Sequence, residues 1–282
     1  MNLTGNTPFI QLAPKLYAKF EAYNPSGSIK DRMASYILQK AEENGDIKPG
    51  YTIVEASSGN TGIAFALLAA QKGYECIIIM PRNMSEERKQ MMTAFGARII
   101  EVGDNAFRDA IKTRDELVNN FETYWTPKQF TNPYNIECHE KTTAVEVGRD
   151  VLSIPTRLSA LVSGAGTGGT IMGCQRHLSQ LWSDAKFLLT MPEEDALTHG
   201  IQGINDGEDF LVDKSVIDGE LIVSTEDAKA RANKLARENG LLVGISSGAN
   251  VLAAERWIKE NNPRGIVVTF LCDRGERYLS CM

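Results

Sequence analysis

Short apolar runs alternate with amphipathic stretches along most of the chain. The apolar runs indicate strands at residues 52–55, 76–80, 98–102, 160–163, 187–190 and 266–271. The stretches beside them have helical spacing, at residues 61–72, 85–95, about 105–121, 169–181, 225–239 and 249–260. Strands that are apolar without alternation are buried on both faces. The pattern therefore predicts an α/β fold with one or two doubly wound parallel sheets covered by helices.

The length of 282 residues corresponds to roughly two domains of about 150 residues each. Asn132 and Pro133 indicate a break near the middle of the chain. The 24 glycines and 10 prolines are ordinary usage, which excludes collagen-like and disordered chains. Acidic side chains outnumber basic ones by 36 to 30, so the net charge is −6. Nucleic acids and anionic membranes attract clustered Lys and Arg, and we therefore expect neither as a partner.

The cysteines are scattered and form no CxxC pair, so we expect neither a zinc site nor a redox motif; they are Cys76, Cys138, Cys174, Cys272 and Cys281. Cys138 stands beside His139, but neighbours on a helix point in different directions, and packing is the expected role of both. No apolar run reaches the roughly 18 residues that span a bilayer, and the start, MNLTGNTPF, lacks the features of a signal peptide. We expect a reducing, cytoplasmic location.

The first segment with candidate chemistry is NPSGSIKDR, residues 24–32. Pro25 and Gly27 predict a turn, and Ser28 can cap a helix that has Lys30 in its first turn. The positive end of the helix dipole disfavours the charged form of a lysine there, which favours an amine that attacks an aldehyde. An ordinary surface lysine is the alternative that these residues leave open.

The second segment is EASSGNTG, residues 55–62, which begins where the predicted strand 52–55 ends. A turn of small and hydroxyl residues between a strand and a helix leaves N–H groups free at the helix N-terminus. Six consecutive small or polar residues exceed what helix capping needs. We therefore expect a cradle for a carboxylate or phosphate here, with a plain capped loop as the alternative.

The third segment is GAGTGGT, residues 164–170, between a predicted strand and a predicted helix. Gly164, Gly166 and Gly169 match the dinucleotide fingerprint G-x-G-x-x-G. Glu193 and Glu194 follow Gly169 by 24 and 25 residues, near the end of the next predicted strand, where an acid could bind a ribose. An NAD site therefore stays open, and both interpretations share a phosphate held by backbone N–H groups.

The fourth segment is GISSGAN, residues 244–250, which follows a short apolar run and opens the predicted helix 249–260. A hydroxyl in this segment can face the nitrogen of a heterocycle or cap the helix. Taken alone, the segment favours the cap.

In this order, the four segments resemble the fold-type II pyridoxal-phosphate enzymes, and within them the family of cysteine synthase and cystathionine β-synthase. The resemblance extends over nearly the whole chain. The matching motifs are GNTP (5–8), NPSGSIKDR, SSGNTG, QFxNPxN (129–135), HEKTT (139–143), GAGTGGT, IQGI (201–204), GISSGA and GERYLS (275–280). MSEER (84–88) and the short N-terminal segment resemble the bacterial second isozyme of cysteine synthase.

The resemblance implies a role for each matching residue. Lys30 would bind pyridoxal phosphate as an internal aldimine and later take the Cα proton of the substrate. Asn60 would hydrogen-bond the ring hydroxyl of the cofactor, and Ser246 would face its ring nitrogen. The cofactor phosphate would be bound by Gly166, Thr167, Gly168, Gly169 and Thr170. The amino-acid substrate, chiefly its carboxylate, would be bound by Ser57, Ser58, Gly59, Thr61 and Gln129.

The resemblance implies an enzyme that forms L-cysteine from O-acetylserine, or a similar activated serine, and sulfide through an aminoacrylate. A serine at the ring nitrogen leaves that nitrogen largely unprotonated, which suits β-elimination better than transamination. Cystathionine synthesis and cysteine desulfhydration to hydrogen sulfide are alternatives for the same site. An NAD-dependent dehydrogenase would leave NPSGSIKDR and SSGNTG unexplained, and an inactive partner-binding homologue would have no need of Lys30.

The chain departs from the family pattern in several places. Ala144 and Val145 stand where similar proteins have Gly-Pro before Glu146, PEED (192–195) replaces Glu-Pro-x-x-Ser, and Cys272 replaces a proline. About ten residues are missing between GNTP and NPSG. We expect neither a haem-binding extension before residue 1 nor a regulatory module after residue 282, which disfavours an animal-type cystathionine synthase. These departures affect the expected substrate more than the expected cofactor.

The resemblance also divides the chain into two domains with the cofactor between them. Residues 24–132 would form a smaller domain that carries Lys30 and SSGNTG. Residues 1–23 plus 133–282 would form a larger domain with the phosphate loop and Ser246. Similar enzymes are mostly homodimers, and the tail of a serine acetyltransferase is a partner that the resemblance admits.

Overall fold

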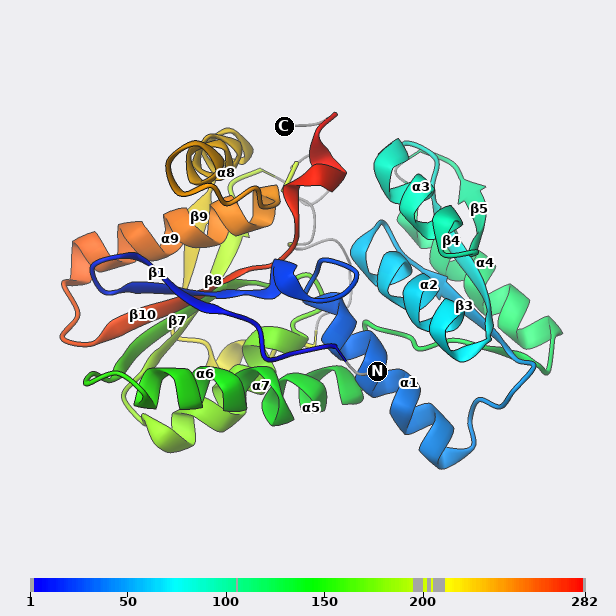
Figure 1. Ribbon diagram of the computed structural model, residues 1–282, viewed down its shortest axis with the longest axis horizontal. Coiled ribbons are helices and arrows are strands. Elements are labelled where there is room, and N and C mark those ends of the chain that lie inside the picture. The colour runs from blue at the N-terminus through cyan, green and yellow to red at the C-terminus, as the bar shows by residue number, and fades with distance from the viewer. Residues whose placement is uncertain (1–2, 105, 195–199, 202–203, 205–210, 281–282) are drawn as a thin grey trace.

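The computed structural model describes residues 3–104, 106–194, 200–201, 204 and 211–280, and these contain two sheets side by side (Figure 1). The smaller sheet is parallel throughout, with strand order β5-β4-β3-β6. Its strands are β3 (Thr52–Ala56), β4 (Glu75–Pro81), β5 (Arg98–Val102) and β6 (Tyr124–Trp125). Because parallel strands end at the same edge, the loop that follows β3 lies at the carboxyl edge of this sheet.

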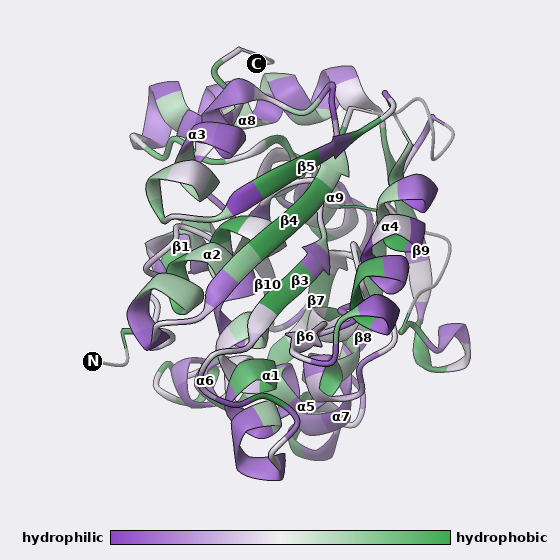
Figure 2. Cartoon of the chain, turned by 90° about the vertical axis from the view of Figure 1, so that its right-hand side faces the viewer, coloured by the Kyte–Doolittle hydropathy of each residue, from purple (hydrophilic) through white to green (hydrophobic). Residues whose placement is uncertain are grey.

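Helices cover both faces of the smaller sheet (Figure 2). They are α1 (Lys30–Asn44), α2 (Asn60–Lys72), α3 (Glu86–Ala94) and α4 (Phe107–Asn120). Ile37 of α1 and Phe65 of α2 pack in one core with Ile53 of β3. Ala110 of α4 packs in a second core with Val54 on the opposite face of the strand. Successive residues of β3 thus enter different cores, which explains why the strand is apolar without alternation.

The larger sheet has the order β1-β2-β10-β7-β8-β9. Its strands are β1 (Phe9–Ala13), β2 (Leu16–Phe20), β7 (Leu158–Gly164), β8 (Lys186–Pro192), β9 (Gly219–Val223) and β10 (Ile266–Leu271). One face is covered by α8 (Thr225–Asn239) and α9 (Ile245–Asn261). The other is covered by α5 (Tyr134–Lys141), α6 (Thr143–Leu152) and α7 (Gly169–Leu181). The predicted α/β fold with sheets covered by helices on both faces is confirmed.

Three differences from the predicted elements concern the larger sheet and helix α9. The larger sheet is not wholly parallel, because β1 pairs antiparallel with β2 as an edge hairpin. The strand β2 was not predicted because Lys19, its fourth residue, reads as a polar break in the sequence, although its side chain is fully buried. Helix α9 begins at Ile245, four residues before its predicted start, so Ser246 lies in its first turn.

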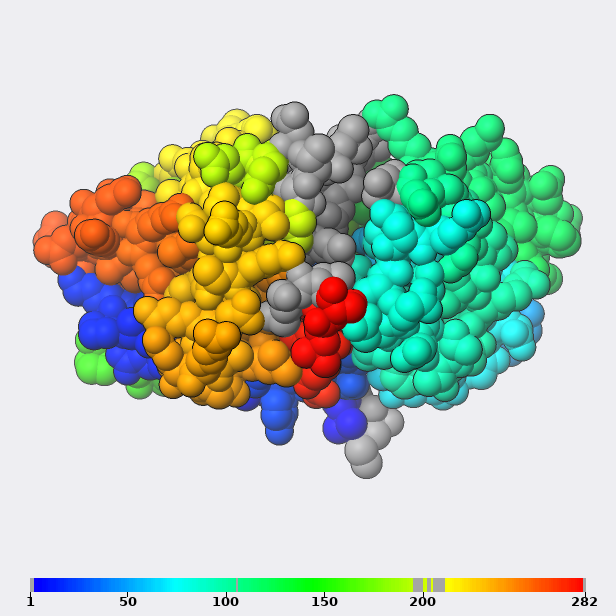
Figure 3. Space-filling model, turned by 90° about the horizontal axis from the view of Figure 1, so that it is seen from above, coloured from blue at the N-terminus to red at the C-terminus, as the bar shows by residue number. Residues whose placement is uncertain are grey.

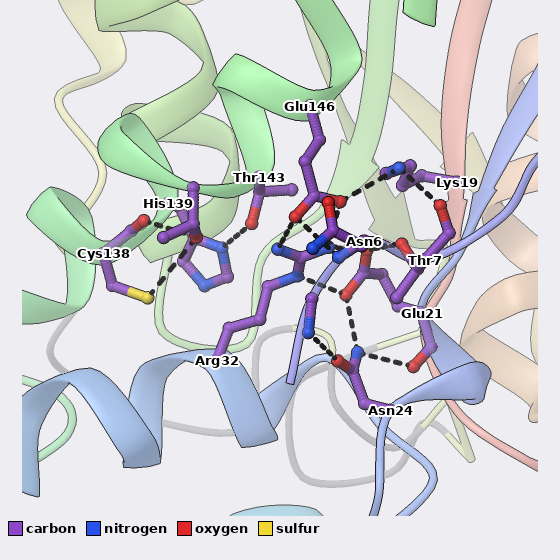
Figure 4. A network of polar contacts seen from close by, with 12 residues as sticks. Asn6, Thr7, Lys19, Glu21, Asn24, Arg32, Cys138, His139, Thr143 and Glu146 are labelled. Carbon is purple, nitrogen blue, oxygen red and sulfur yellow. Dashed lines mark hydrogen bonds and ion pairs between the residues drawn. The ribbon is translucent and has the colours of Figure 1, made fainter. Parts of the chain in front are cut away.

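A cluster of buried polar side chains joins α1 to α6 and to the N-terminal segment (Figure 4). Arg32 of α1 binds Glu21 with Nε at 2.7 Å and Glu146 of α6 with Nη1 at 2.8 Å. Lys19 donates to the carbonyl of Thr7 at 2.6 Å and pairs with Glu146 at 3.0 Å. The two cations thus share Glu146, and this cluster fixes the helix that begins with Lys30 against the larger sheet.

The C-terminal segment, residues 272–280, lies where the two halves of the molecule meet (Figure 3). The N–H of Ile29 donates to the carbonyl of Cys272 at 2.8 Å, and the N–H of Arg274 donates to the carbonyl of Gly27 at 3.1 Å. Ser85, which precedes α3, donates through its hydroxyl to the carbonyl of Arg277 at 3.2 Å. The end of the chain therefore contacts both the turn before α1 and the start of α3.

Three further findings concern the described residues as a whole. None of their helices is both long enough and apolar enough to cross a membrane. They contain no cluster of three or more His, Cys, Asp or Glu side chains that could hold a metal ion. Their cysteines are all free thiols, namely Cys76, Cys138, Cys174 and Cys272. Cys281 lies outside the described residues, as do Asp195, Gln202 and Gly203 of the sequence motifs.

Candidate active site

Two adjoining cavities share Lys30, Asn60, Gly166 and Thr167 in their walls. Counting their open mouths, they hold about 470 and 510 Å³ of space free of protein atoms. Every residue predicted for the site except Gly169 lines one of them: Lys30, Ser57, Ser58, Gly59, Asn60, Thr61, Gln129, Gly166, Thr167, Gly168, Thr170 and Ser246. The fold therefore assembles the four sequence motifs around one continuous hollow.

Lys30 is the first residue of α1, in agreement with the motif. The hydroxyl of Ser28 accepts a hydrogen bond from the N–H of Lys30 at 3.3 Å, although Ile29 is the residue that directly precedes the helix. Gly27 has a φ of +88°, and a Cβ there would lie 2.8 Å from Nη2 of Arg277. The turn therefore requires glycine, and it holds Lys30 at the junction of the two cavities.

The second residue of α1, Asp31, is a buried carboxylate. It accepts hydrogen bonds from the N–H of Ser26, at 2.6 Å, and from the Ser26 hydroxyl. Burial raises the pKa of Asp31 to about 6, and it outweighs these hydrogen bonds and the charge of Arg277, which act in the opposite direction. The carboxyl next to Lys30 therefore takes up a proton in the folded protein more readily than an exposed aspartate does.

The loop between β3 and α2 forms one wall of the first cavity. The hydroxyl of Ser57 accepts from the N–H groups of Gly59, at 3.1 Å, and Gly62, at 3.0 Å, and so caps α2. Thr61 donates through its hydroxyl to Oε1 of Gln129 at 2.6 Å. The loop is thus shaped by its own hydroxyls, and the N-terminus of α2 faces the hollow with N–H groups that suit a carboxylate.

The glycine loop between β7 and α7 forms a wall of the second cavity. Gly168 has a φ of +88°, which favours glycine. At Gly169, a Cβ would lie only 2.0 Å from Oδ1 of Asn135. Asn135, which is 1% exposed, donates to the carbonyl of Gln129 at 3.0 Å and to the hydroxyl of Thr167 at 2.9 Å. Gly169 thus lies behind the wall, where its lack of a side chain lets Asn135 support the loop.

The first turn of α9 closes the second cavity. Ser246 lines it and is 5% exposed. Asn250 accepts from the N–H of Gly164 at 2.7 Å, so α9 is tied to the glycine loop. Cys272 also lines this cavity, and burial raises the pKa of its thiol to about 12. At neutral pH this thiol is therefore protonated and unsuited to act as a nucleophile.

His139 supports the glycine loop from behind. Its Nδ1 lies 2.8 Å from the hydroxyl of Thr143, and its Nε2 lies 3.3 Å from the hydroxyl of Thr170. Burial lowers its pKa well below the usual range, and the charges of Arg32 and Lys30 act in the same direction. The imidazole is therefore neutral, and its contacts are those of a buried residue in a hydrogen-bonded core.

Several cavity residues were not among those predicted, and they are Ile29, Arg88, Phe107, Phe130, Ser163, Gly164, Ala165, Ile204, Asn250, Cys272 and Tyr278. Arg88 is the most notable, because it is 2% exposed, donates to the carbonyl of Ser58 at 3.1 Å and lies 4.7 Å above the ring of Tyr278. Its position in MSEER, on a helix with little apolar periodicity, gave no signal for a buried residue. Packing between the C-terminal segment and α3 places it there.

The charges in the hollow suit anions. Among the described residues that line the two cavities, the charged ones are Lys30 and Arg88. The N-terminus of α7, with Gly168 and the hydroxyls of Thr167 and Thr170, offers hydrogen-bond donors to a phosphate. The residues present therefore fit a phosphorylated aldehyde cofactor that Lys30 binds.

The acidic pair expected for an NAD site lies elsewhere. Glu194 accepts from the N–H of Thr225 at 2.8 Å, at the start of α8. The N–H of Glu193 donates to the carbonyl of Val223 at 3.0 Å, which continues the pairing of β8 with β9. Neither residue lines the cavities, so neither stands where a dinucleotide site would have its ribose-binding acid.

Two halves built on largely parallel sheets, with a lysine at the start of α1 and a glycine-rich loop lining the same cavity, are the arrangement of a fold-type II pyridoxal-phosphate enzyme. The model of one protein family, described as pyridoxal-phosphate dependent enzyme, matches residues 1–273. The chain belongs to this family. It is therefore a pyridoxal-phosphate-dependent enzyme, and the glycine loop is not the fingerprint of an NAD-dependent dehydrogenase.

Individual relatives are similar over the full chain. A probable cysteine synthase of Bacillus subtilis is 38% identical over 99% of this chain and 95% of its own. The structure of a hydrogen sulfide-producing enzyme from Fusobacterium nucleatum has a TM-score of 0.92, at 38% identity over 99% of this chain and 89% of that one. The structure of an O-acetylserine dependent cystathionine β-synthase from Helicobacter pylori has a TM-score of 0.90, at 33% identity over 99% of this chain and 96% of that one.

Proposed function

We propose that this enzyme forms L-cysteine from O-acetylserine, or a similar activated serine, and sulfide. The observation that carries the proposal is the place of Lys30, where the phosphate cradle and the loop 57–61 open into one hollow. The similarity to cysteine synthases along the whole chain supports the same activity. The positive charges of Lys30 and Arg88 suit a substrate that carries a carboxylate.

The cofactor would be held by residues from three elements. Gly166, Thr167, Gly168 and Thr170 would bind its phosphate, with Gly169 behind them at the start of α7, whereas Asn60 would bind its ring hydroxyl and Ser246 its ring nitrogen. When bound, pyridoxal phosphate supplies an electron sink for the negative charge that forms at the substrate Cα. Ser246 is neutral and donates or accepts a hydrogen bond without adding charge, in contrast to an aspartate at that place.

The substrate would be oriented by the loop after β3. Ser57, Ser58, Gly59, Thr61 and Gln129 would bind its carboxylate, in reach of the helix N-terminus of α2. Lys30 Nζ, once free of the cofactor, would take the proton from Cα. The bond between Cβ and the acetate oxygen then breaks and acetate leaves. Sulfide forms the new bond to Cβ, and Lys30 Nζ returns the proton to Cα.

Turnover by the purified, cofactor-loaded protein tests this proposal. With O-acetylserine and sulfide, we expect cysteine and acetate in equal amounts. Lys30→Ala should abolish the reaction, whereas Lys40→Ala, at a partly exposed position on the same helix, should retain it. A colourless protein that produces no cysteine would contradict the proposal and favour an inactive, partner-binding homologue.

Release of hydrogen sulfide from cysteine is a second candidate, because the chain is 34 to 39% identical to hydrogen sulfide-producing enzymes with TM-scores of 0.92 to 0.93. Cystathionine synthesis from O-acetylserine and homocysteine is a third. Parallel assays with cysteine alone and with homocysteine in place of sulfide separate the three activities. The highest kcat/KM among them identifies the principal reaction.

The proposal also covers the domain boundaries, the oligomeric state, the cellular location and a protein partner. We propose that residues 24–132 form the smaller domain and residues 1–23 plus 133–282 the larger one. We also propose a homodimer, which a mass measurement in solution tests, and a cytoplasmic location, which the free thiols of the described cysteines support. Docking of a serine acetyltransferase tail is a further partner proposal, tested by titration with a peptide that carries that C-terminus.

A further inference from the structure

The side chain of Asn60 is held by two charged residues of the C-terminal segment. Arg277 donates from Nη1 to Oδ1 of Asn60. Asn60 in turn donates from Nδ2 to Oδ2 of Asp273 at 2.6 Å. Both partners are buried, since Asp273 is 0% and Arg277 is 2% exposed. Both polar ends of the amide are thus engaged before any ligand binds.

The chemistry of the partners allows the amide only one orientation. A guanidinium group can only donate hydrogen bonds, and an ionised carboxylate can only accept them. If the amide were turned over, its NH₂ group would face Arg277 and its oxygen would face Asp273. Two donors would then face each other at Arg277 and two acceptors at Asp273, and neither buried partner would have its hydrogen bond to Asn60. Arg277 and Asp273 therefore specify where Oδ1 and Nδ2 of Asn60 point.

The two partners are themselves held in place. Arg277 also donates from Nη2 to the carbonyl of Ser26 at 2.7 Å, in the turn that leads to Lys30. Asp273 accepts a second hydrogen bond at Oδ2, from the hydroxyl of Tyr278. A Cβ at Gly244 would lie 2.1 Å from Oδ1 of Asp273, so the backbone packs closely against the other side of the carboxylate. A rigid frame thus surrounds the amide.

The amide keeps one donor that these partners do not use. The NH₂ group of an asparagine has two hydrogens, and Asp273 receives one of them. Asn60 lines both cavities beside Lys30, so the second hydrogen is available to an acceptor in the hollow. A ring oxygen with negative charge, next to the aldehyde that Lys30 binds, is such an acceptor.

We propose that Asp273 and Arg277 are positioning residues that orient the Asn60 amide so that its Nδ2 donates to the ring oxygen of the cofactor. This inference rests on the proposed role of Asn60 in the cofactor site. It extends that site to Asp273 and Arg277, which line neither cavity and act on it through Asn60. Arg277 also joins Asn60 to the turn before Lys30, through the carbonyl of Ser26.

A double-mutant cycle tests the proposal through cofactor binding. The dissociation constant of pyridoxal phosphate and the position of its visible absorption band are measured for the unchanged protein, Arg277→Gln, Asn60→Ala and the double variant. Either single change should weaken binding about 10- to 100-fold and shift the band, because a hydrogen bond with a charged partner is lost or misdirected. The double variant should bind as weakly as Asn60→Ala, with the same band, because Arg277 acts through Asn60.

Arg274→Gln is the matched control. Arg274 lies in the same segment and donates from Nε to the carbonyl of Ala22 at 2.9 Å, without contact to Asn60. It should retain both the affinity and the band. If Arg277→Gln does not fold, Arg277→Lys replaces it, because a lysine keeps the charge but cannot bridge Asn60 and Ser26 with a planar fork. The band should still shift in that variant.

The outcomes separate this inference from the proposed function. A coloured protein in which the Arg277 variants leave affinity and band unchanged would overturn the inference and leave the proposed function intact. Additive effects in the double variant would overturn it too, because they would show that Arg277 does not act through Asn60. A protein that binds no pyridoxal phosphate in any form would overturn both.

Discussion

Glu146 offers a quantitative test of the buried polar cluster that holds α1. Its two oxygens accept from Nη1 and Nη2 of Arg32, each at 2.8 Å, and Oε2 also lies 3.0 Å from Nζ of Lys19. Burial alone would raise the pKa of Glu146, but the hydrogen bonds and charge of Arg32 outweigh burial and lower it to about 2. Glu146→Gln keeps the shape of the side chain and removes the charge.

The pKa of Glu146 determines how much the ionised carboxylate stabilises the fold and over which pH range. A drop from 4.5 to about 2 corresponds to about 3.4 kcal/mol of stability, which the slight exposure of the carboxylate reduces to about 2 kcal/mol. Because the pKa is lower in the folded state than in the unfolded one, this stability is present above pH 4.5 and is lost as the pH falls toward 2. Roughly four tenths of it should be gone at pH 3.5.

Urea unfolding of Glu146→Gln and the unchanged protein at pH 7, 5 and 3.5 measures this contribution. We expect the variant to be less stable by about 2 kcal/mol at pH 7, and the difference to shrink at pH 3.5, because a protonated Glu146 resembles glutamine. Glu116→Gln, at an exposed ion pair with Lys112, should change stability by less than about 0.5 kcal/mol at each pH. Two results would refute the reasoning. One is equal stability of Glu146→Gln and the unchanged protein at pH 7, and the other is a stability difference that is the same at all three pH values.

Other predictions concern the site itself. Lys30→Ala should lower turnover by at least about 10²-fold in the cysteine assay, and appreciable residual activity would exclude a role in proton transfer. Gly169→Ala should weaken pyridoxal phosphate binding about tenfold or more, because the new Cβ displaces Asn135; Gly103→Ala, with its nearest neighbour at 3.5 Å, should bind normally in the same titration. Thr61→Val loses the 2.6 Å hydrogen bond to Gln129, so KM for O-acetylserine should rise about tenfold while the absorption band of the cofactor stays unchanged. A changed band would assign Thr61 to the cofactor instead.

The sequence indicated the covered sheets and the walls of the site with good accuracy. The strand 266–271 and the helices 169–181 and 225–239 have the predicted bounds. The strand is a continuous run of buried residues after Gly265, and each helix combines helical periodicity with glycine or a capping residue at an end. The glycine loops were recognisable because close backbone approach excludes side chains, as at Gly169.

Contacts between distant segments were beyond the sequence. Lys19 reads as a polar break, and it becomes a buried strand residue only because Asp150 and Glu146 neutralise it from a helix far along the chain. Arg88 and Arg277 likewise appear as ordinary surface charges in polar motifs. Their burial follows from the packing of the C-terminal segment between the two halves, which no local pattern encodes.

Identification of the residue that binds the cofactor tests the central claim most directly. The loaded protein is treated with borohydride, digested and analysed by mass spectrometry for a pyridoxyl group. The account predicts a label on Lys30 alone, with loss of the yellow colour. A label on another lysine, or colour that borohydride does not remove, would contradict it.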